Sequence, residues 1–324
     1  MNVQKNFYVH TLSNKEAWNM FVKIVGDTAK NCDFNGIAVE VVQKCAGLLV
    51  AVATIANALK NKSDLVHWKD ASRQLGRPIT GDIEGMDADV YSAIKLSYNF
   101  LENEEAKSIF LLCGLENAGY SICIEDLLRY CMGLDLFNDV DTLEEGRIKL
   151  QKLIDFLKGS CLLLDGNTKT SVKMHDIIHT VAGLIARSDK LMLNIQNITR
   201  LEEELEKKIH KETTTISLPE KDVNYELPER LEFPKLQLFF LSKKDLSFQI
   251  PDTFFEGTKE LKVLDLTKIR LLPLPSSLCR LTNFQTLCLK ECLLGDIAII
   301  RKLKNLEILS FQNSDIKELP GEIK

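Results

Sequence analysis

A recurring leucine pattern in the last third of the chain constrains its fold most. Apolar residues return in the order apolar-x-x-Leu-x-apolar at 261–266, 284–289 and 306–311, with steps of 23 and 22 residues, and shorter versions start near Ile216 and Leu236. This period is typical of leucine-rich repeats, in which each strand buries its leucines and exposes the residues between them. The sequence therefore predicts a solenoid over 213–324, with an open concave face.

The first part of the chain has the spacing of amphipathic helices. Ser13-Asn14-Lys15-Glu16 forms a capping box before a helix that Gly26 ends, and further helices are predicted at about 37–47, 48–59 and 64–75. Glycines and a proline between 76 and 85 indicate a connection. We predict a compact helical domain over 13–80.

A second pattern runs from 86 to 190. Helices are predicted at 90–96, 104–113, 124–132 and 142–157, followed by a β-hairpin of 161–164 and 171–174 around Asp165-Gly166-Asn167. A closing helix is predicted over 176–186. Helices followed by a hairpin indicate a winged-helix domain, and the charged segment within 191–212 indicates a linker. The predicted class is therefore mixed α and α/β.

Composition limits the classes of partner. With 324 residues and a net charge of −5, the chain offers neither the clustered cations of a nucleic-acid surface nor those of an anionic-membrane footprint. Its longest nearly apolar run, 46–59, is shorter than the ~20 residues that a membrane helix needs. Nine scattered cysteines without a Cys-x-x-Cys pair fit a reducing cytoplasm. A zinc site at Cys279, Cys288 and Cys292 is disfavoured, because Cys288 lies between core leucines and should point outward.

One motif places an imidazole and a carboxylate where a strand becomes a helix. In Val172-Lys173-Met174-His175-Asp176-Ile177-Ile178, His175 and Asp176 stand at the expected helix start. A helix N-terminus carries unpaired N–H groups and suits an anion. Taken alone, His175 is better explained as a hydrogen-bonded histidine between domains than as an anion contact. Likewise, the residues Gly47-Leu48-Leu49-Val50-Ala51 taken alone are better explained as a helix turn with core residues.

The chain resembles plant intracellular nucleotide-binding leucine-rich-repeat immune receptors, most closely those of the coiled-coil class. Three features carry this resemblance, namely Met174-His175-Asp176, the turn at Gly47 and the repeats. The resemblance covers nearly the whole chain. It implies the tail of a nucleotide-binding domain at 1–12, the helical ARC1 domain of the NB-ARC region at 13–80, the winged-helix ARC2 domain at 86–190 and the repeats. It implies that His175 contacts the β-phosphate of ADP, with Met174 and Asp176 in support, and that Gly47, Leu48, Leu49 and Val50 contact adenine and ribose.

The chain departs from the family pattern at several positions. Leu49 and Val50 replace the proline and leucine of Gly-Leu-Pro-Leu-Ala, and His179 and Thr180 replace a common Arg and Asp. The segment 76–82 approaches the spacing of a phosphate-binding loop but lacks its lysine and hydroxyl. The resemblance implies that this loop precedes Met1, so the chain is expected to be part of a receptor. By itself it is expected to bind ADP or ATP weakly or not at all.

The expected function is signalling in plant innate immunity rather than catalysis. An ADP/ATP-regulated switch would respond to a protein at the repeats, namely a pathogen effector, a guarded host protein or the receptor's own body, with self-association as a further possibility. The main alternative is a nucleotide-free adaptor, or competitor of a full-length receptor, that binds proteins through its repeats. A DNA-binding regulator is disfavoured because 176–186 contains no Lys or Arg. A zinc hydrolase is disfavoured because His175-Asp176-Ile177-Ile178-His179 has Asp instead of Glu and no recognisable third ligand, His210 lying in the linker.

Overall fold

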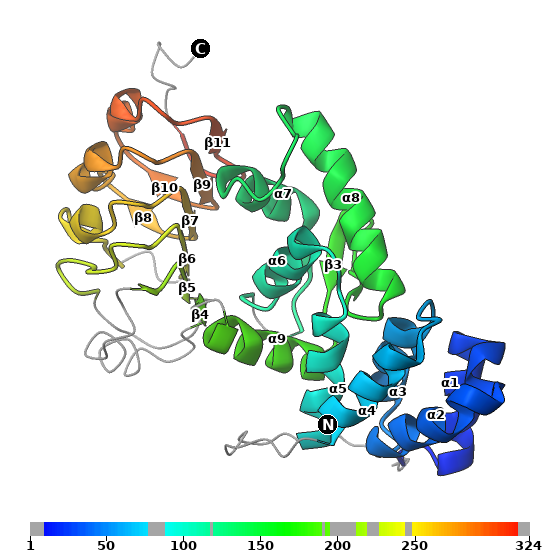
Figure 1. Cartoon of the computed structure of the whole chain (residues 1–324). Helices are drawn as coiled ribbons and strands as arrows, with labels where there is room; N and C mark the ends of the chain where they lie inside the picture. Colours follow the sequence, from blue (N-terminus) through cyan, green and yellow to red (C-terminus); the bar gives the residue numbers. More distant parts are fainter. Residues whose placement is uncertain are drawn as a thin grey trace, which may run out of the picture. The chain divides into compact units, whose positions relative to one another are not determined.

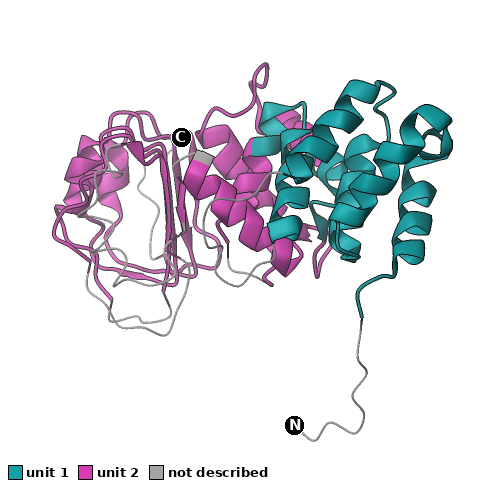
Figure 2. Ribbon diagram, turned by 60° about the horizontal axis from the view of Figure 1, so that its bottom comes forward, with its two compact units in different colours: residues 1–107, 152–164 teal, residues 108–151, 165–324 magenta. Residues whose placement is uncertain are grey.

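The computed structural model describes residues 10–76, 88–116, 119–189, 192–194, 212–218, 227–243 and 248–316. The chain forms two compact units, one of residues 1–107 and 152–164, the other of residues 108–151 and 165–324 (Figure 2). The predicted domain limits stay predictions. The glycine-rich connection at 77–85, most of the predicted linker with His210, and the last repeat turn at 319–323 lie outside the described residues.

The first unit contains five predicted helices (Figure 1). They are α1 (Asn14–Val25), α2 (Cys32–Lys44), α3 (Leu49–Leu59), α4 (Leu65–Leu75) and α5 (Ala88–Asn99), with the short 3₁₀ helix η1 (Asp27–Lys30) after α1. The capping box at Ser13 is confirmed, because its hydroxyl accepts from the Glu16 N–H while the Glu16 carboxylate accepts from the Ser13 N–H. Helix α2 begins five residues earlier than predicted, since the Asn31 side chain caps it through the Asp33 N–H.

Small residues and aromatic rings fill the core of this unit. Helix α3 buries alanines at 51, 53 and 56, which let its neighbours approach closely. Trp68 is fully buried, and Phe21 and Phe34 meet it edge-on at centroid distances of 6.0 and 5.4 Å.

The helices α6 (Glu104–Cys113), α7 (Ile124–Gly133), α8 (Leu143–Gly159) and α9 (Asp176–Asp189) follow as predicted. A small sheet accompanies them, in the order β1 (Ile122–Cys123), β3 (Ser171–Lys173), β2 (Leu164–Asp165). The predicted hairpin was too long, and β1 was not predicted. Cys161 adopts a left-handed conformation and the N–H groups of Leu162 and Leu163 donate to Leu157 at the end of α8, so these residues terminate the helix instead of forming a strand.

The second unit also contains a six-stranded parallel sheet in the order β11-β9-β7-β6-β5-β4. Its strands are β4 (Met192–Asn194), β5 (Thr215–Leu218), β6 (Leu238–Ser242), β7 (Val263–Thr267), β9 (Thr286–Lys290) and β11 (Ile308–Ser310). The last five coincide with the leucine pattern, whereas β4 lies in the predicted linker. Short parallel strands β8 (Arg270–Leu271) and β10 (Leu293–Leu294) pair outside this sheet.

Short 3₁₀ helices follow three of the repeat strands, namely η3 (Phe254–Gly257), η4 (Ser276–Arg280) and η5 (Ala298–Lys302). Between them and the sheet lies a core of leucines with Phe239, Phe254 and Phe255, whose rings meet at 5.0–6.0 Å. The predicted class of helices combined with a parallel sheet is confirmed. Among the described helices, none is both long and apolar enough to cross a bilayer.

Candidate functional site

His175 stands immediately before the first residue of α9, as predicted. Its side chain is exposed, and its Nδ1 atom accepts a hydrogen bond of 3.3 Å from the Ile177 N–H. A nitrogen that accepts this bond carries no proton, so the neutral ring has its proton on Nε2. The imidazole thus presents an Nε2–H donor beside the positive end of α9.

The neighbours of His175 hold this junction in place. Met174 is buried, which anchors the end of β3 in the core of the second unit. Asp176 is exposed in the first turn of α9, where a carboxylate interacts favourably with the helix dipole. Its backbone carbonyl accepts from the Thr180 hydroxyl at 2.9 Å.

Gly47 lies in a turn whose backbone requires glycine. Its φ is +70°, and its carbonyl accepts from the Leu12 N–H at 2.8 Å. A Cβ atom at this position would lie 2.3 Å from the Leu12 carbonyl oxygen. The glycine therefore lets the segment before α1 pass directly against the start of α3.

The residues after Gly47 form the N-terminus of α3. Leu48 occupies the N-cap position without a side-chain cap, and Leu49 in the first turn is 58% exposed. Val50 is half-buried and Ala51 is buried. An exposed leucine beside uncapped N–H groups offers an apolar surface of the type that a flat ring stacks on. Gly47 to Val50 belong to the first unit and His175 to the second, and each is described within its own unit.

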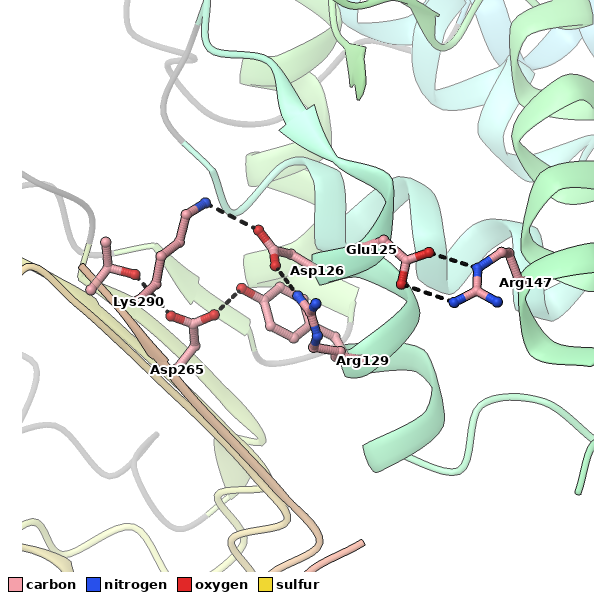
Figure 3. A network of polar contacts seen from close by, with 8 residues as sticks. Glu125, Asp126, Arg129, Arg147, Asp265 and Lys290 are labelled. Atoms are coloured by element: carbon pink, nitrogen blue, oxygen red, sulfur yellow. Dashed lines mark hydrogen bonds and ion pairs between the residues drawn. The ribbon is translucent and has the colours of Figure 1, made fainter. Parts of the chain in front are cut away.

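The structure reveals a polar contact that the sequence did not predict. We call the sheet face that carries the residues between the core leucines the inner face; its cross-strand row is Ser217, Phe240, Asp265, Cys288 and Ser310. The Ser217 hydroxyl donates to the Leu115 carbonyl at 2.8 Å. The Tyr130 hydroxyl donates to the Asp265 carboxylate at 2.7 Å (Figure 3). Residues 115 and 130 therefore cover the inner face.

Ion pairs surround these two hydrogen bonds. The Asp126 carboxylate on α7 contacts Arg129 of the same helix and, at 3.3 Å, Lys290 on β9 (Figure 3). A second pair across the contact joins Lys262 and Asp135 at 2.6 Å. Helix α7 and the turn that follows it are thus each joined to the repeat region by one ion pair.

Two carboxyl groups of this network resist ionisation. Burial, reinforced by the charge of Asp126, raises the pKa of Asp265 to about 6, although the hydrogen bonds from Tyr130 and Thr267 oppose the shift. Burial and the neighbouring Asp265 and Asp126 raise the pKa of Glu116 to about 7. The contact therefore holds protons that an exposed carboxylate would release.

Gly133 marks the closest approach of α7 to the sheet. A Cβ atom there would lie 2.3 Å from Thr286 Oγ1 and 2.7 Å from Val263 Cγ2. The Thr286 hydroxyl is buried and has no hydrogen-bond partner within the described part of the chain. Helix α7 is therefore held against the sheet by close packing at Gly133 as well as by the polar network.

These contacts correct one prediction and add to another. The concave face was predicted to be open, but on β5, β7 and β9 it is contacted by Leu115, Tyr130 and Asp126. Cys288 lies on the face away from the leucine core, as predicted, but it is only 3% exposed because α7 packs against that face. Within the described ranges no group of three His, Cys, Asp or Glu side chains is arranged to hold a metal ion.

Little in the sequence signals the network, because its partners lie up to 164 positions apart. The one available signal is an acidic residue, Asp265, between two core leucines of a repeat strand.

Comparison with known proteins gives a consistent result, although no protein-family model matches the chain. Disease resistance protein At4g27190 of Arabidopsis thaliana is 29% identical over 326 residues, which cover 99% of this chain and 33% of that protein. The probable disease resistance protein At4g27220 of the same plant is 28% identical, with 95% and 33% covered. Disease resistance protein RPS5, also from Arabidopsis thaliana, is 29% identical, with 95% and 36% covered. The chain spans about one third of the length of these relatives.

Proposed function

The chain is related to plant disease resistance proteins, as its motifs suggested, and on this premise we propose that it acts in an immune receptor switched by ADP and ATP. The proposed domains are the helical ARC1 domain, the winged-helix ARC2 domain and the first leucine-rich repeats. The activity is signalling rather than catalysis, in the cytoplasm, and the proposed partners are proteins.

His175 carries this proposal. Its exposed Nε2–H donor at the start of α9 has the chemistry that a phosphate oxygen requires. In the proposed resting state it binds the β-phosphate of ADP, while the turn from Gly47 to Val50 provides an apolar seat for adenine. Bound ADP would then hold the helix α9 in one position, and exchange for ATP would release it.

The experiment measures the rate at which labelled ADP dissociates from the full-length protein. A hydrogen bond to a charged group contributes ~1.5–3 kcal/mol, so His175→Ala should accelerate dissociation by about 10- to 100-fold. His67→Ala is the matched control, because His67 lies on α4 against Phe100 and should leave the rate unchanged. Equal rates for His175→Ala and the unaltered protein would refute the assignment.

A nucleotide-free adaptor is the second candidate. It is favoured by the parallel sheet of strands with the leucine pattern, a framework of the kind that presents a protein-binding surface. An immunoblot of native tissue with an antibody to residues 248–316 separates the two candidates. A band near 36.7 kDa would favour the adaptor, and a band several times larger would favour the switch.

A further inference from the structure

The turn 114–116, which follows α6, is bound on one side by α9 and on the other by the repeat sheet. His179 on α9 is 7% exposed, and its Nε2 lies 2.7 Å from the Glu116 carbonyl oxygen, so it donates a hydrogen bond there. One residue earlier, the Leu115 carbonyl accepts from the Ser217 hydroxyl on β5 at 2.8 Å. Two adjacent carbonyl groups of this turn therefore bind helix α9 and strand β5.

The turn has little freedom to move separately from α9. A Cβ atom on Gly114 would lie 2.8 Å from the Cβ of Ala182, so the backbones of the turn and of α9 are in close contact. His179 is also tied to the candidate phosphate contact, because its own N–H donates to the His175 carbonyl at 2.9 Å. A displacement of residues 114–116 would therefore also displace the N-terminal residues of helix α9.

On the sheet side, the same turn borders the polar network of the inner face. Ser217 lies in the cross-strand row that includes Asp265, and the carboxyl group of Glu116 interacts with Asp265, Asp126 and Lys290. The turn is thus connected to the inner face in two ways. One is the hydrogen bond from Ser217 to Leu115, and the other is the electrostatic interaction of Glu116 with the charged groups of the network.

We propose that the turn 114–116 couples the repeat sheet to His175, with His179 as the positioning residue that passes the coupling on. His179 itself touches no nucleotide in this scheme. It fixes the first turn of α9 relative to the sheet, so that an event at the repeats changes how firmly His175 is held. The importance of His175 rests on the proposed function, whereas the mechanical coupling can be tested separately.

The test uses amide hydrogen exchange of the full chain, read over residues 177–183. Ser217→Ala removes the bond to Leu115, and we expect exchange at the start of α9 to rise about fivefold, as the loss of one hydrogen bond predicts. Thr253→Ala is the matched control, because Thr253 donates a similar 2.9 Å bond to a carbonyl, that of Glu229, away from the turn. It should leave exchange in α9 unchanged.

A second pair of variants shows whether His179 is the route. Helix α9 is also followed by β4, which pairs with β5, so this strand is the alternative path by which Ser217→Ala would affect α9. His179→Gln keeps a donor near the Nε2 position and should preserve the response to Ser217→Ala, whereas His179→Leu removes the donor and should abolish it. A response that survives in His179→Leu, or that is missing in the unaltered background, would overturn the proposal.

The failure of this coupling differs from a failure of the proposed function. If only the coupling is wrong, Ser217→Ala leaves hydrogen exchange in α9 unchanged, while His175→Ala still accelerates ADP dissociation. If only the nucleotide role is wrong, Ser217→Ala raises hydrogen exchange in α9 as described, while His175→Ala leaves the rate of ADP dissociation unchanged.

Discussion

At the scale of single residues, the protein places ionisable groups where burial changes their proton affinity. Asp265 is 2% exposed and faces Asp126 and Glu116, with Lys290 as the nearby cation. In the unfolded chain its pKa would return to about 3.8, whereas in the folded unit it is about 6. The folded unit therefore binds more protons between these two values, and this contribution to stability is present below pH 4 and lost as the pH rises through about 6.

We predict that Asp265→Asn removes this pH dependence. Between pH 5 and pH 7 the free energy of unfolding of the unaltered unit should fall by about 1 kcal/mol relative to the variant. An amide retains an acceptor oxygen for the Tyr130 hydroxyl, so the fold should persist. Urea unfolding at several pH values, followed by circular dichroism, measures the difference.

Asp252→Asn serves as the control for this prediction. Hydrogen bonds from the Ser276 side chain and backbone lower the pKa of Asp252, so it is ionised in both states above pH 5. Its effect on stability should be constant from pH 5 to pH 7. A constant difference for Asp265→Asn as well would contradict the assignment of a raised pKa.

Gly47→Ala should destabilise the first unit. Alanine is strained at a φ of +70°, and its Cβ would meet the Leu12 carbonyl, so we expect a loss of ~1–3 kcal/mol. Trp18 and Trp68 are the only tryptophans and both lie in this unit, so their fluorescence during urea unfolding reports on it.

Gly36→Ala is the matched comparison for Gly47→Ala. Gly36 lies within α2 at an ordinary φ with no atom within 4 Å of an added Cβ, so alanine should stabilise the helix by up to ~1 kcal/mol. If both variants changed stability in the same direction, the special role of Gly47 would be wrong.

At the scale of elements, helix α7 depends on a close fit to the repeat sheet. Gly133→Ala should push the end of α7 away from Thr286 and Val263, at a cost of ~1–3 kcal/mol. Hydrogen exchange over 124–133 should rise, and Thr286→Ala in the same chain should recover part of the loss. Gly159→Ala, where an added Cβ meets nothing within 4 Å, should have no such effect. Unchanged exchange in Gly133→Ala would mean that α7 is not held by this contact.

The elements themselves were largely predictable from local signals. The Ser13 capping box, the Asp64 cap of α4 and the spacing of leucines each act within a few residues, so the sequence displays them directly. Strand β1 has only two residues and depends on pairing with Ser171 and Val172, which no local pattern announces. The cover over the inner face was missed for the same reason, because it joins residues that are distant in the chain.

The candidate site was predictable only in part. The pattern around His175 correctly placed it at the start of a helix, and Gly47 correctly preceded one. The Nε2–H tautomer depends on the geometry of the Ile177 N–H, and the role of His179 depends on a carbonyl 63 residues away. Such details require the fold.

At the scale of the whole molecule, the closed inner face restricts where partners bind. A protein that recognised the inner face over β5, β7 and β9 would have to displace Leu115 and helix α7 and break the hydrogen bonds to Ser217 and Asp265. In the proposed switch this displacement would act on the same turn that holds α9. Recognition and nucleotide state would then be linked thermodynamically, so each changes the other.

The most direct test of the central claim is the nucleotide content of the native protein. An antibody to residues 248–316 would recover it from resting tissue, and acid release followed by chromatography would identify any bound nucleotide. The proposed switch predicts ADP close to one molecule per chain. Recovery of folded protein without ADP or ATP would contradict the switch and leave the adaptor as the better account.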